Sequence, residues 1–226
     1  MNGGNDSGAI GITGLTESEV TLTIALKVAD ILKRHNINAI LTRNKDIRVE
    51  LADRVKIANN NNADYFISIH CNSSSNPTAC GTETYAYYSS IAGSKLATYV
   101  QNTLTNEIKL VDRGIKYSDF YVLKNTNMPA ILVEVAFISN LVEEKLLKSE
   151  EFLDKVRVGI AKGILQELGV DYIKELDEIK LNLHGKEMIV DGYFKNGINY
   201  VPIRLLEKLG RDVEWKNNTV YISYKK

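Results

Sequence analysis

Two short, almost uninterrupted apolar runs constrain the fold of this chain most strongly. They are YFISIH at residues 65–70 and AILVEVA at residues 130–136. Strands covered on both faces of a parallel sheet have this near-continuous apolar character, whereas half-exposed strands alternate apolar and polar residues. Between such runs, apolar residues recur at helical spacing, first over 17–36, where Thr16 is placed to cap the helix. The pattern predicts an α/β domain with a mostly parallel, twisted sheet and helices on both faces.

The same criteria place the other elements. We expect strands at 38–42 and 81–88, a short extended piece at 120–123, and helices at 47–60, 94–108 and 142–168, the last as one or two helices. From about residue 179 the sequence becomes β-rich. We therefore divide the chain into a domain at 1–172 and a small α+β domain at 178–226, built as two strands, a helix and two strands. Asp191-Gly192 and Asn196-Gly197 are turn signals within the second domain.

Charge and composition exclude some classes of partner. The chain has 28 basic and 28 acidic residues, so no net field would hold it on nucleic acid or on an anionic membrane. No apolar run approaches the roughly 20 residues that span a bilayer, and no signal-peptide pattern is visible at the N-terminus. Cys71 and Cys80 could form a short-loop disulfide or remain as free thiols, and we expect free thiols.

Three side chains are candidates for chemistry. His70 lies where an apolar strand ends, Glu134 interrupts an apolar strand, and Glu17 lies in the first turn of a helix. Each has a purely structural alternative: a histidine that caps a strand, a carboxylate in an internal ion pair, and a carboxylate favoured by the helix dipole. Together they offer nitrogen and oxygen ligands that zinc accepts, plus a carboxylate that can activate water.

The chain also resembles a known family in a series of ordered segments. They are GGNDSGAIG at 3–11, GLTE at 14–17, LTR at 41–43, LADR at 51–54 with Ala58-Asn59, AD at 63–64, SIHCN at 68–72, GTE at 81–83, RGIK at 113–116, VL at 122–123, MPA at 128–130, LVE at 132–134 and FISN at 137–140. From about residue 3 to 168, these segments resemble the zinc-dependent N-acetylmuramoyl-L-alanine amidases of the Amidase_3 family.

The resemblance implies roles for particular residues. Glu17 and His70 match two zinc (Zn2+) ligands, and Glu134 matches the glutamate that takes a proton from the attacking water and passes it to the leaving amine. The family's first ligand, a histidine, matches Asn2, and the strand that leads into it is missing. We expect that the given chain starts too late. The alternative is a site that lacks one ligand.

The implied substrate is bacterial peptidoglycan, cut between N-acetylmuramic acid and L-alanine. Asn72, Arg113 and Lys116 are the expected substrate contacts. For Arg113 and Lys116, which match a family segment near the site, the choice is between contacts to substrate carboxylates and a solvated basic turn. The resemblance implies an enzyme of the cell wall or extracellular space, and we expect a monomer. The alternative function is a catalytically impaired peptidoglycan-binding protein that lacks the first zinc ligand.

The second domain has a resemblance of its own. DGY at 191–193, NYVPIR at 199–204 and Trp215 resemble the small domain named after the N-terminus of copper amine oxidases. The name does not imply copper, because no His or Cys cluster is present in this stretch. We expect a wall-attachment or spacer module.

Overall fold

The computed structural model describes residues 3–173 and, beyond them, the backbone of residues 177–183, 186–195, 198–200, 211–216 and 219–224. The chain forms two compact units, Met1–Tyr172 and Ile173–Lys226. Asn2, the position that matches the first zinc ligand, lies outside the described residues.

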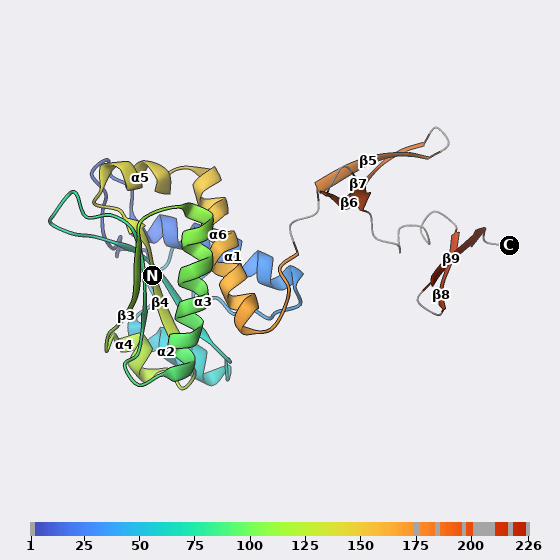
Figure 1. Cartoon of the computed structure of the whole chain (residues 1–226). Helices are drawn as coiled ribbons and strands as arrows, with labels where there is room; N and C mark the ends of the chain where they lie inside the picture. The colour runs from blue at the N-terminus through green and yellow to red at the C-terminus, as the bar shows by residue number, and fades with distance from the viewer. Residues whose placement is uncertain are drawn as a thin grey trace. The chain divides into compact units, whose positions relative to one another are not determined.

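The first unit is built on one open sheet of four strands in the order β1-β4-β2-β3. Figure 1 labels two of these strands, β3 and β4. β1 (Phe66–Asn72) is parallel to β4 (Ala130–Phe137), which is antiparallel to β2 (Thr82–Ala86). β2 is parallel to β3 (Asp112–Tyr117) at the far edge. Two of the three pairings are parallel, which confirms the predicted mostly parallel α/β sheet.

Helices cover both faces of this sheet. The long helices share one hydrophobic core with the strands, and a smaller core lies on the opposite face. The large core contains residues of α1 (Glu17–Arg34), α3 (Ile91–Ile108), α5 (Leu141–Leu147) and α6 (Glu150–Glu167), and the small core contains residues of α2 (Leu51–Asn60) and α4 (Tyr121–Asn125). The Thr16 hydroxyl accepts a hydrogen bond from the Glu19 amide, which confirms the predicted cap of α1.

The period of two along the strands assigns each residue to one of the two cores. In β4, Ile131, Val133 and Val135 belong to the large core, whereas Ala130 and Leu132 belong to the small one. Glu134 therefore follows Leu132 on the face that carries α2 and α4. The same alternation places His70 of β1 on that face, after Phe66 and Ser68. His70 and Glu134 therefore lie on the same face of the sheet as the small core, next to its last strand residues.

Two predicted elements are wrong. Residues 38–42 form no strand, because no described strand pairs with them; they line a groove of about 390 Å³ that runs along the edge of β1. Residues 120–123 do not form an extended piece but begin α4, because Val122 and Leu123 turn into the small core. The edge strand β3 had no counterpart among the predicted strands.

In the second unit, β5 (Asp177–Leu183), β6 (Lys186–Lys195) and β7 (Ile198–Tyr200) form an antiparallel sheet, and β8 (Arg211–Lys216) pairs with β9 (Thr219–Tyr224). The turn predicted at Asp191-Gly192 is wrong, because both residues pair with β5 in the middle of β6. The helix predicted between the two strand pairs of this domain and the turn at Asn196-Gly197 lie outside the described residues.

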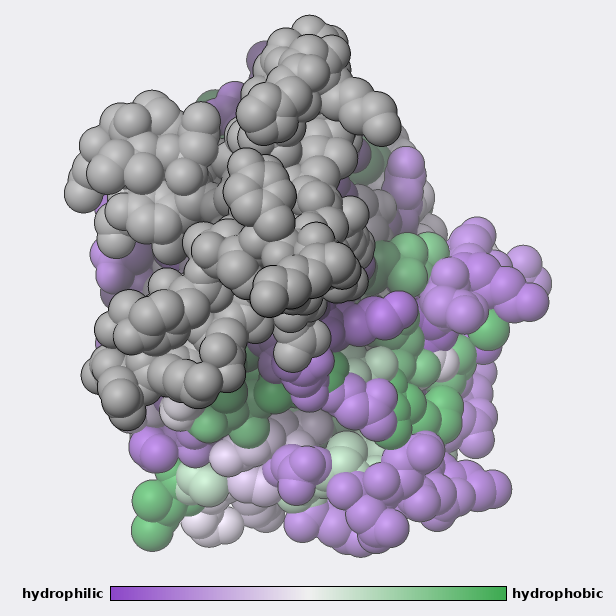
Figure 2. Space-filling model, turned by 90° about the vertical axis from the view of Figure 1, so that its right-hand side faces the viewer, coloured by the Kyte–Doolittle hydropathy of each residue, from purple (hydrophilic) through white to green (hydrophobic). Residues whose placement is uncertain are grey.

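The described surface carries both hydrophobic and hydrophilic residues. Figure 2 shows one face on which hydrophobic residues (green) lie exposed among hydrophilic ones (purple). None of the described helices is long and apolar enough to cross a membrane. Cys71 and Cys80 are both free thiols, as expected, and Cys71 is buried.

Candidate active site

Glu17 and His70 form a direct contact at the carboxyl end of β1. His70 Nδ1 lies 2.7 Å from Glu17 Oε1, and the other carboxylate oxygen accepts the Ala9 amide at 2.9 Å. Since an ionised carboxylate only accepts hydrogen bonds, Nδ1 carries the proton and donates. Nε2 then accepts from the Ser68 hydroxyl at 3.0 Å. Both ring nitrogens are thereby oriented, and the imidazole side chain is 19% exposed.

Burial and the mutual contact set the charges of this pair. Burial raises the pKa of Glu17, but the hydrogen bond and charge of His70 outweigh it and leave the pKa below its usual value. Burial lowers the pKa of His70 more than Glu17 raises it. The pair is therefore an anionic carboxylate beside a neutral imidazole. Neutral imidazole and carboxylate are the forms that ligate a cation.

Glu134 lies beside His70 in the next strand, where the two residues are register partners. Its Oε2 atom is buried and has no hydrogen-bond partner within residues 3–173. Burial, followed by the charges of Glu17 and Glu83, raises the pKa of Glu134 to about 8. A carboxyl group that titrates near neutral pH can both accept and return a proton, as a general acid–base catalyst must.

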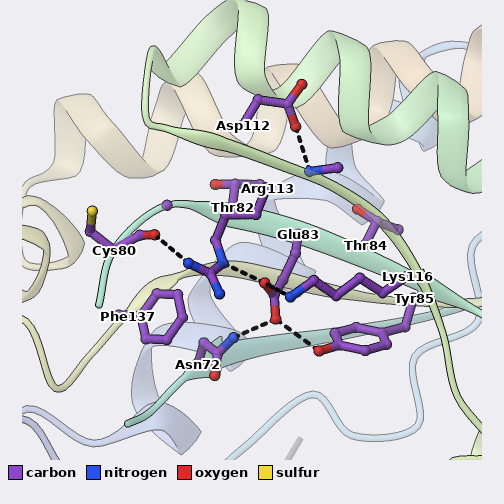
Figure 3. A network of polar contacts seen from close by, with 12 residues as sticks. Asn72, Cys80, Thr82, Glu83, Thr84, Tyr85, Asp112, Arg113, Lys116 and Phe137 are labelled. Atoms are coloured by element: carbon purple, nitrogen blue, oxygen red, sulfur yellow. Dashed lines mark hydrogen bonds and ion pairs between the residues drawn. The ribbon is translucent and has the colours of Figure 1, made fainter. Parts of the chain in front are cut away.

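Glu83 is the register partner of Glu134 on the other side, in β2. Figure 3 shows the network around its carboxylate. Oε1 accepts from Asn72 Nδ2 at 2.9 Å and from the Tyr85 hydroxyl at 2.8 Å. Oε2 accepts from Arg113 Nε at 2.5 Å and from Lys116 Nζ at 2.6 Å. Burial alone would raise the pKa of Glu83, but these donors, led by Lys116 and Arg113, lower it to about 2.

The predicted site residues fall into two adjoining groups. Glu17, His70 and Glu134 form one group at the ends of β1 and β4. The predicted substrate contacts form the second group through Glu83, to which Asn72, Arg113 and Lys116 all bond. Sequence reasoning did not assign a role to Glu83. The available signal was a carboxylate in the alternating strand GTETYAYY, next to a glycine.

Two neighbouring carboxylates at the start of α5 hold the loops around the site. Glu144 is fully buried and accepts hydrogen bonds from the Thr13 amide at 2.9 Å and the Thr13 hydroxyl at 2.7 Å. This contact fixes the loop that leads into α1 and Glu17. Glu143 accepts from the amides of Gly81 at 2.7 Å and Phe137 at 2.6 Å, next to the Glu83 network.

The residues present fit a zinc ion in part. Glu17 Oε1 and His70 Nδ1 converge on one point, where a cation could replace the shared proton. The unpartnered buried oxygen of Glu134 lies next to them. No group of three or more His, Cys, Asp or Glu residues suited to a metal occurs within the described residues. The described part therefore contains two of the three expected ligand positions, Glu17 and His70, and the third, Asn2, is outside it.

Comparisons with known proteins agree with this geometry. The family model described as N-acetylmuramoyl-L-alanine amidase (Amidase_3) matches residues 2–166. The endolysin of Bacillus phage SPP1 is 40% identical over 75% of this chain and 64% of its own length. The amidase AmiA of Escherichia coli is 33% identical, over 73% of this chain and 72% of its own length.

A solved structure gives the same answer for the fold. The catalytic domain of CwlV, an N-acetylmuramoyl-L-alanine amidase from Bacillus (Paenibacillus) polymyxa, is 42% identical to this chain. It superimposes with a TM-score of 0.73, over 75% of this chain and 95% of that one. The family model, the relatives and the solved structure agree, and the chain belongs to the N-acetylmuramoyl-L-alanine amidase family, Amidase_3.

Proposed function

We propose that the chain is a zinc-dependent amidase that hydrolyses the bond between N-acetylmuramic acid and L-alanine in peptidoglycan. The observation that carries the proposal is Glu134, a carboxyl with a pKa of about 8 and a buried, unpartnered oxygen next to two potential metal ligands. A buried polar atom without a partner costs free energy, so its retention favours a functional role. The family membership supplies the reaction class.

In the proposed site, Glu17 and His70 hold the zinc ion. When bound, zinc supplies Lewis acidity that polarises the scissile carbonyl and acidifies water. The protein fixes the orientation of both ligands, since Ala9 bonds to the second oxygen of Glu17 and Ser68 to the second nitrogen of His70. Such supporting contacts keep each ligand in one rotamer. The Ser68 hydroxyl can also accept a hydrogen bond, so the neutral imidazole could carry its proton on Nε2 and leave Nδ1 for the cation.

Glu134 carries out the proton transfer in this proposal. As water attacks the carbonyl carbon, Glu134 Oε2 accepts a proton from it, and the carboxyl then gives that proton to the departing nitrogen. The C–N bond breaks, leaving a carboxyl on the lactyl group of the sugar and a free amine on L-alanine. A pKa near the working pH allows one group to perform both transfers.

Further assignments complete the proposal. Asn72, Arg113 and Lys116 contact the substrate, and the protein acts on the cell wall as a monomer. Residues 178–226 form a small domain that resembles the N-terminal domain of copper amine oxidases. In this proposal, the small domain attaches the catalytic domain of residues 1–172 to the wall. Peptidoglycan, the substrate of homologous amidases, is found in the cell wall, which supports this location.

The proposed catalytic domain also needs a strand along β1. Within the described residues β1 pairs only with β4, although its sequence FISIHC has the apolar character of a central strand. The groove of about 390 Å³ beside it is lined by residues 36–42 and 61–69. Two buried polar atoms of its lining residues, Thr42 Oγ1 and Arg54 Nη1, have no partner in the described part. An extended segment in this groove would supply backbone partners for the free edge of β1 and for the two unpartnered side-chain atoms.

The test of the function is product analysis. Purified peptidoglycan is incubated with the protein and Zn²⁺, and the released material is examined by mass spectrometry. Intact peptide stems with a new L-alanine amine are the expected product. Glu134→Gln should lose this activity, whereas Glu107→Gln, which alters a surface ion pair with Lys162, should keep it. Release of single amino acids, or equal activity of Glu134→Gln, would contradict the proposal.

A further inference from the structure

The carboxylate of Glu83 is the centre of an unusually complete set of donors. Its side chain is 3% exposed and accepts from groups on three strands: Asn72 of β1, Tyr85 of β2, and Arg113 and Lys116 of β3 (Figure 3). Charge-assisted bonds of 2.5 and 2.6 Å to two cations fix all the participants in one arrangement. The network is therefore preformed before any substrate binds.

Among the directly bonded groups, the two cations outnumber the one carboxylate, and the nearby Glu143 carboxylate is a further charge that acts on Arg113. One carboxylate faces two cations, and the side chains of Arg113 and Lys116 remain 34% and 36% exposed. Arg113 is held further by Cys80, whose carbonyl accepts from Nη1 at 3.3 Å, and by the Phe137 ring, 4.9 Å from the guanidinium carbon. Arg113 Nη2 has no hydrogen-bond partner between residues 3 and 173. A rigid, partly exposed guanidinium with a free N–H donor is suited to an anion.

We propose that Arg113 and Lys116 form a subsite for a carboxylate of the peptide substrate, and that Glu83 is the positioning residue for both cations. The inference rests on the proposed function, in which the substrate is a peptide stem with free carboxylates. Glu83 is the register partner of Glu134, so the subsite lies within about two strand spacings, or roughly 10 Å, of the proton-transferring group. The leaving peptide, rather than the uncharged sugar, carries the matching charge.

If Glu83, Arg113 and Lys116 only attached β3 to the sheet, a different arrangement would be sufficient. To attach the edge strand β3 to the sheet, Glu83 needs one cation, and that cation could be covered. Here there are two, and both keep exposed surface. The two roles can be separated experimentally because only a carboxylate subsite distinguishes a carboxylate ligand from its uncharged amide.

The experiment compares two synthetic stem peptides that differ only in their carboxyl groups, which are free in one and amidated in the other. Their dissociation constants for the full chain are measured by titration calorimetry or NMR. The wild type should bind the free form about five- to tenfold more tightly, the difference between a charge-assisted and a neutral hydrogen bond. The ratio is taken on one folded protein, so a loss of stability alone leaves it unchanged.

Three variants and a control test the assignment. Arg113→Gln and Lys116→Gln should each bring the ratio towards one. Glu83→Asp keeps the charge but shortens the side chain by one methylene, so it should also lower the ratio if positioning matters. Lys27→Gln, which removes a surface lysine paired with Glu150, should leave the ratio unchanged.

The outcomes separate the two proposals. A wild-type ratio of one overturns the subsite whether or not the protein hydrolyses peptidoglycan. A ratio that survives in Glu83→Asp overturns the positioning role alone, and one that survives in Lys116→Gln removes that residue from the subsite. A retained preference for carboxylate with no release of stems overturns the proposed hydrolysis but leaves the subsite intact. In the active enzyme, the same variants should raise KM for the free-carboxylate substrate more than they lower kcat.

Discussion

Replacing Glu134 by glutamine should make the metal-free protein more stable at neutral pH. The carboxyl of Glu134 has a folded-state pKa of about 8, above its ordinary value of 4.5. Between these two values the folded protein holds a proton that the unfolded chain releases, so the free energy of unfolding falls as pH rises. Below pH 4.5 the group is protonated in both states and costs nothing. Glutamine removes this dependence, because it never ionises.

The size of the effect follows from the same two values. At about 1.4 kcal/mol per pKa unit, the cost grows from zero near pH 4.5 to about 3 kcal/mol at pH 7 and about 4 kcal/mol at pH 8, where the folded-state carboxyl is half ionised. The glutamine amide still lacks a partner for one buried atom, which subtracts about 1 kcal/mol. The expected net gain at pH 7 is about 2 kcal/mol, or a rise in melting temperature of roughly 4–8 °C.

Differential scanning calorimetry of the chelator-treated protein at pH 4.5, 7 and 8 measures this gain. Glu134→Gln should melt above the wild type at pH 7, further above it at pH 8, and no higher at pH 4.5. Glu151→Gln, at an exposed carboxylate of α6 paired with Lys155, should match the wild type at all three pH values. Equal melting temperatures of Glu134→Gln and the wild type at pH 8 would refute a buried, proton-holding carboxyl.

Three further outcomes can be checked. Glu144→Gln should lower the stability by about 2 kcal/mol in chemical denaturation, because every group facing that carboxylate is a donor; an unchanged midpoint would argue against the contacts of the loop before α1. Gly163→Ala should cost about 1–3 kcal/mol, since the added Cβ would lie 2.4 Å from the backbone of α3; unaltered stability would mean that α3 and α6 separate easily. In a thiol-reagent assay of the native protein, Cys80 should react before Cys71, whose pKa is raised by burial; equal rates would contradict the buried position of Cys71.

The site residues of the sheet that could be predicted from sequence are those that stand out from the apolar residues next to them. An apolar strand buried on both faces needs no polar residue, so a glutamate inside AILVEVAF indicates a site from sequence alone. His70 at the end of the other apolar strand was found in the same way. The structure adds that His70 and Glu134 are register partners on one face, a relation that depends on the order of strands along the sheet.

Contacts that depend on tertiary structure could not be predicted. Glu17 meets His70 across 53 positions of sequence, and in a helix's first turn a glutamate has an ordinary explanation. The strand β3 was missed because DRGIKY contains little apolar sequence; it is an exposed edge that is held through Glu83. The opposite error occurred at 38–42, where apolar residues in a strand-like pattern have no described strand to pair with.

The register of Glu83 against Glu134 poses a physical problem whose solution agrees with the roles proposed for both residues. Two carboxylates directly opposite each other on neighbouring strands repel when both are charged. The fold lowers the pKa of Glu83 to about 2 by surrounding it with donors and cations, and raises that of Glu134 to about 8 by burial without a partner. One carboxylate is thereby permanently charged and holds other side chains in place, while its neighbour titrates near neutral pH. Environments that push two adjacent pKa values apart separate a positioning group from a proton-transferring one. On this reasoning, making Glu83 neutral would relieve the repulsion and lower the pKa of Glu134.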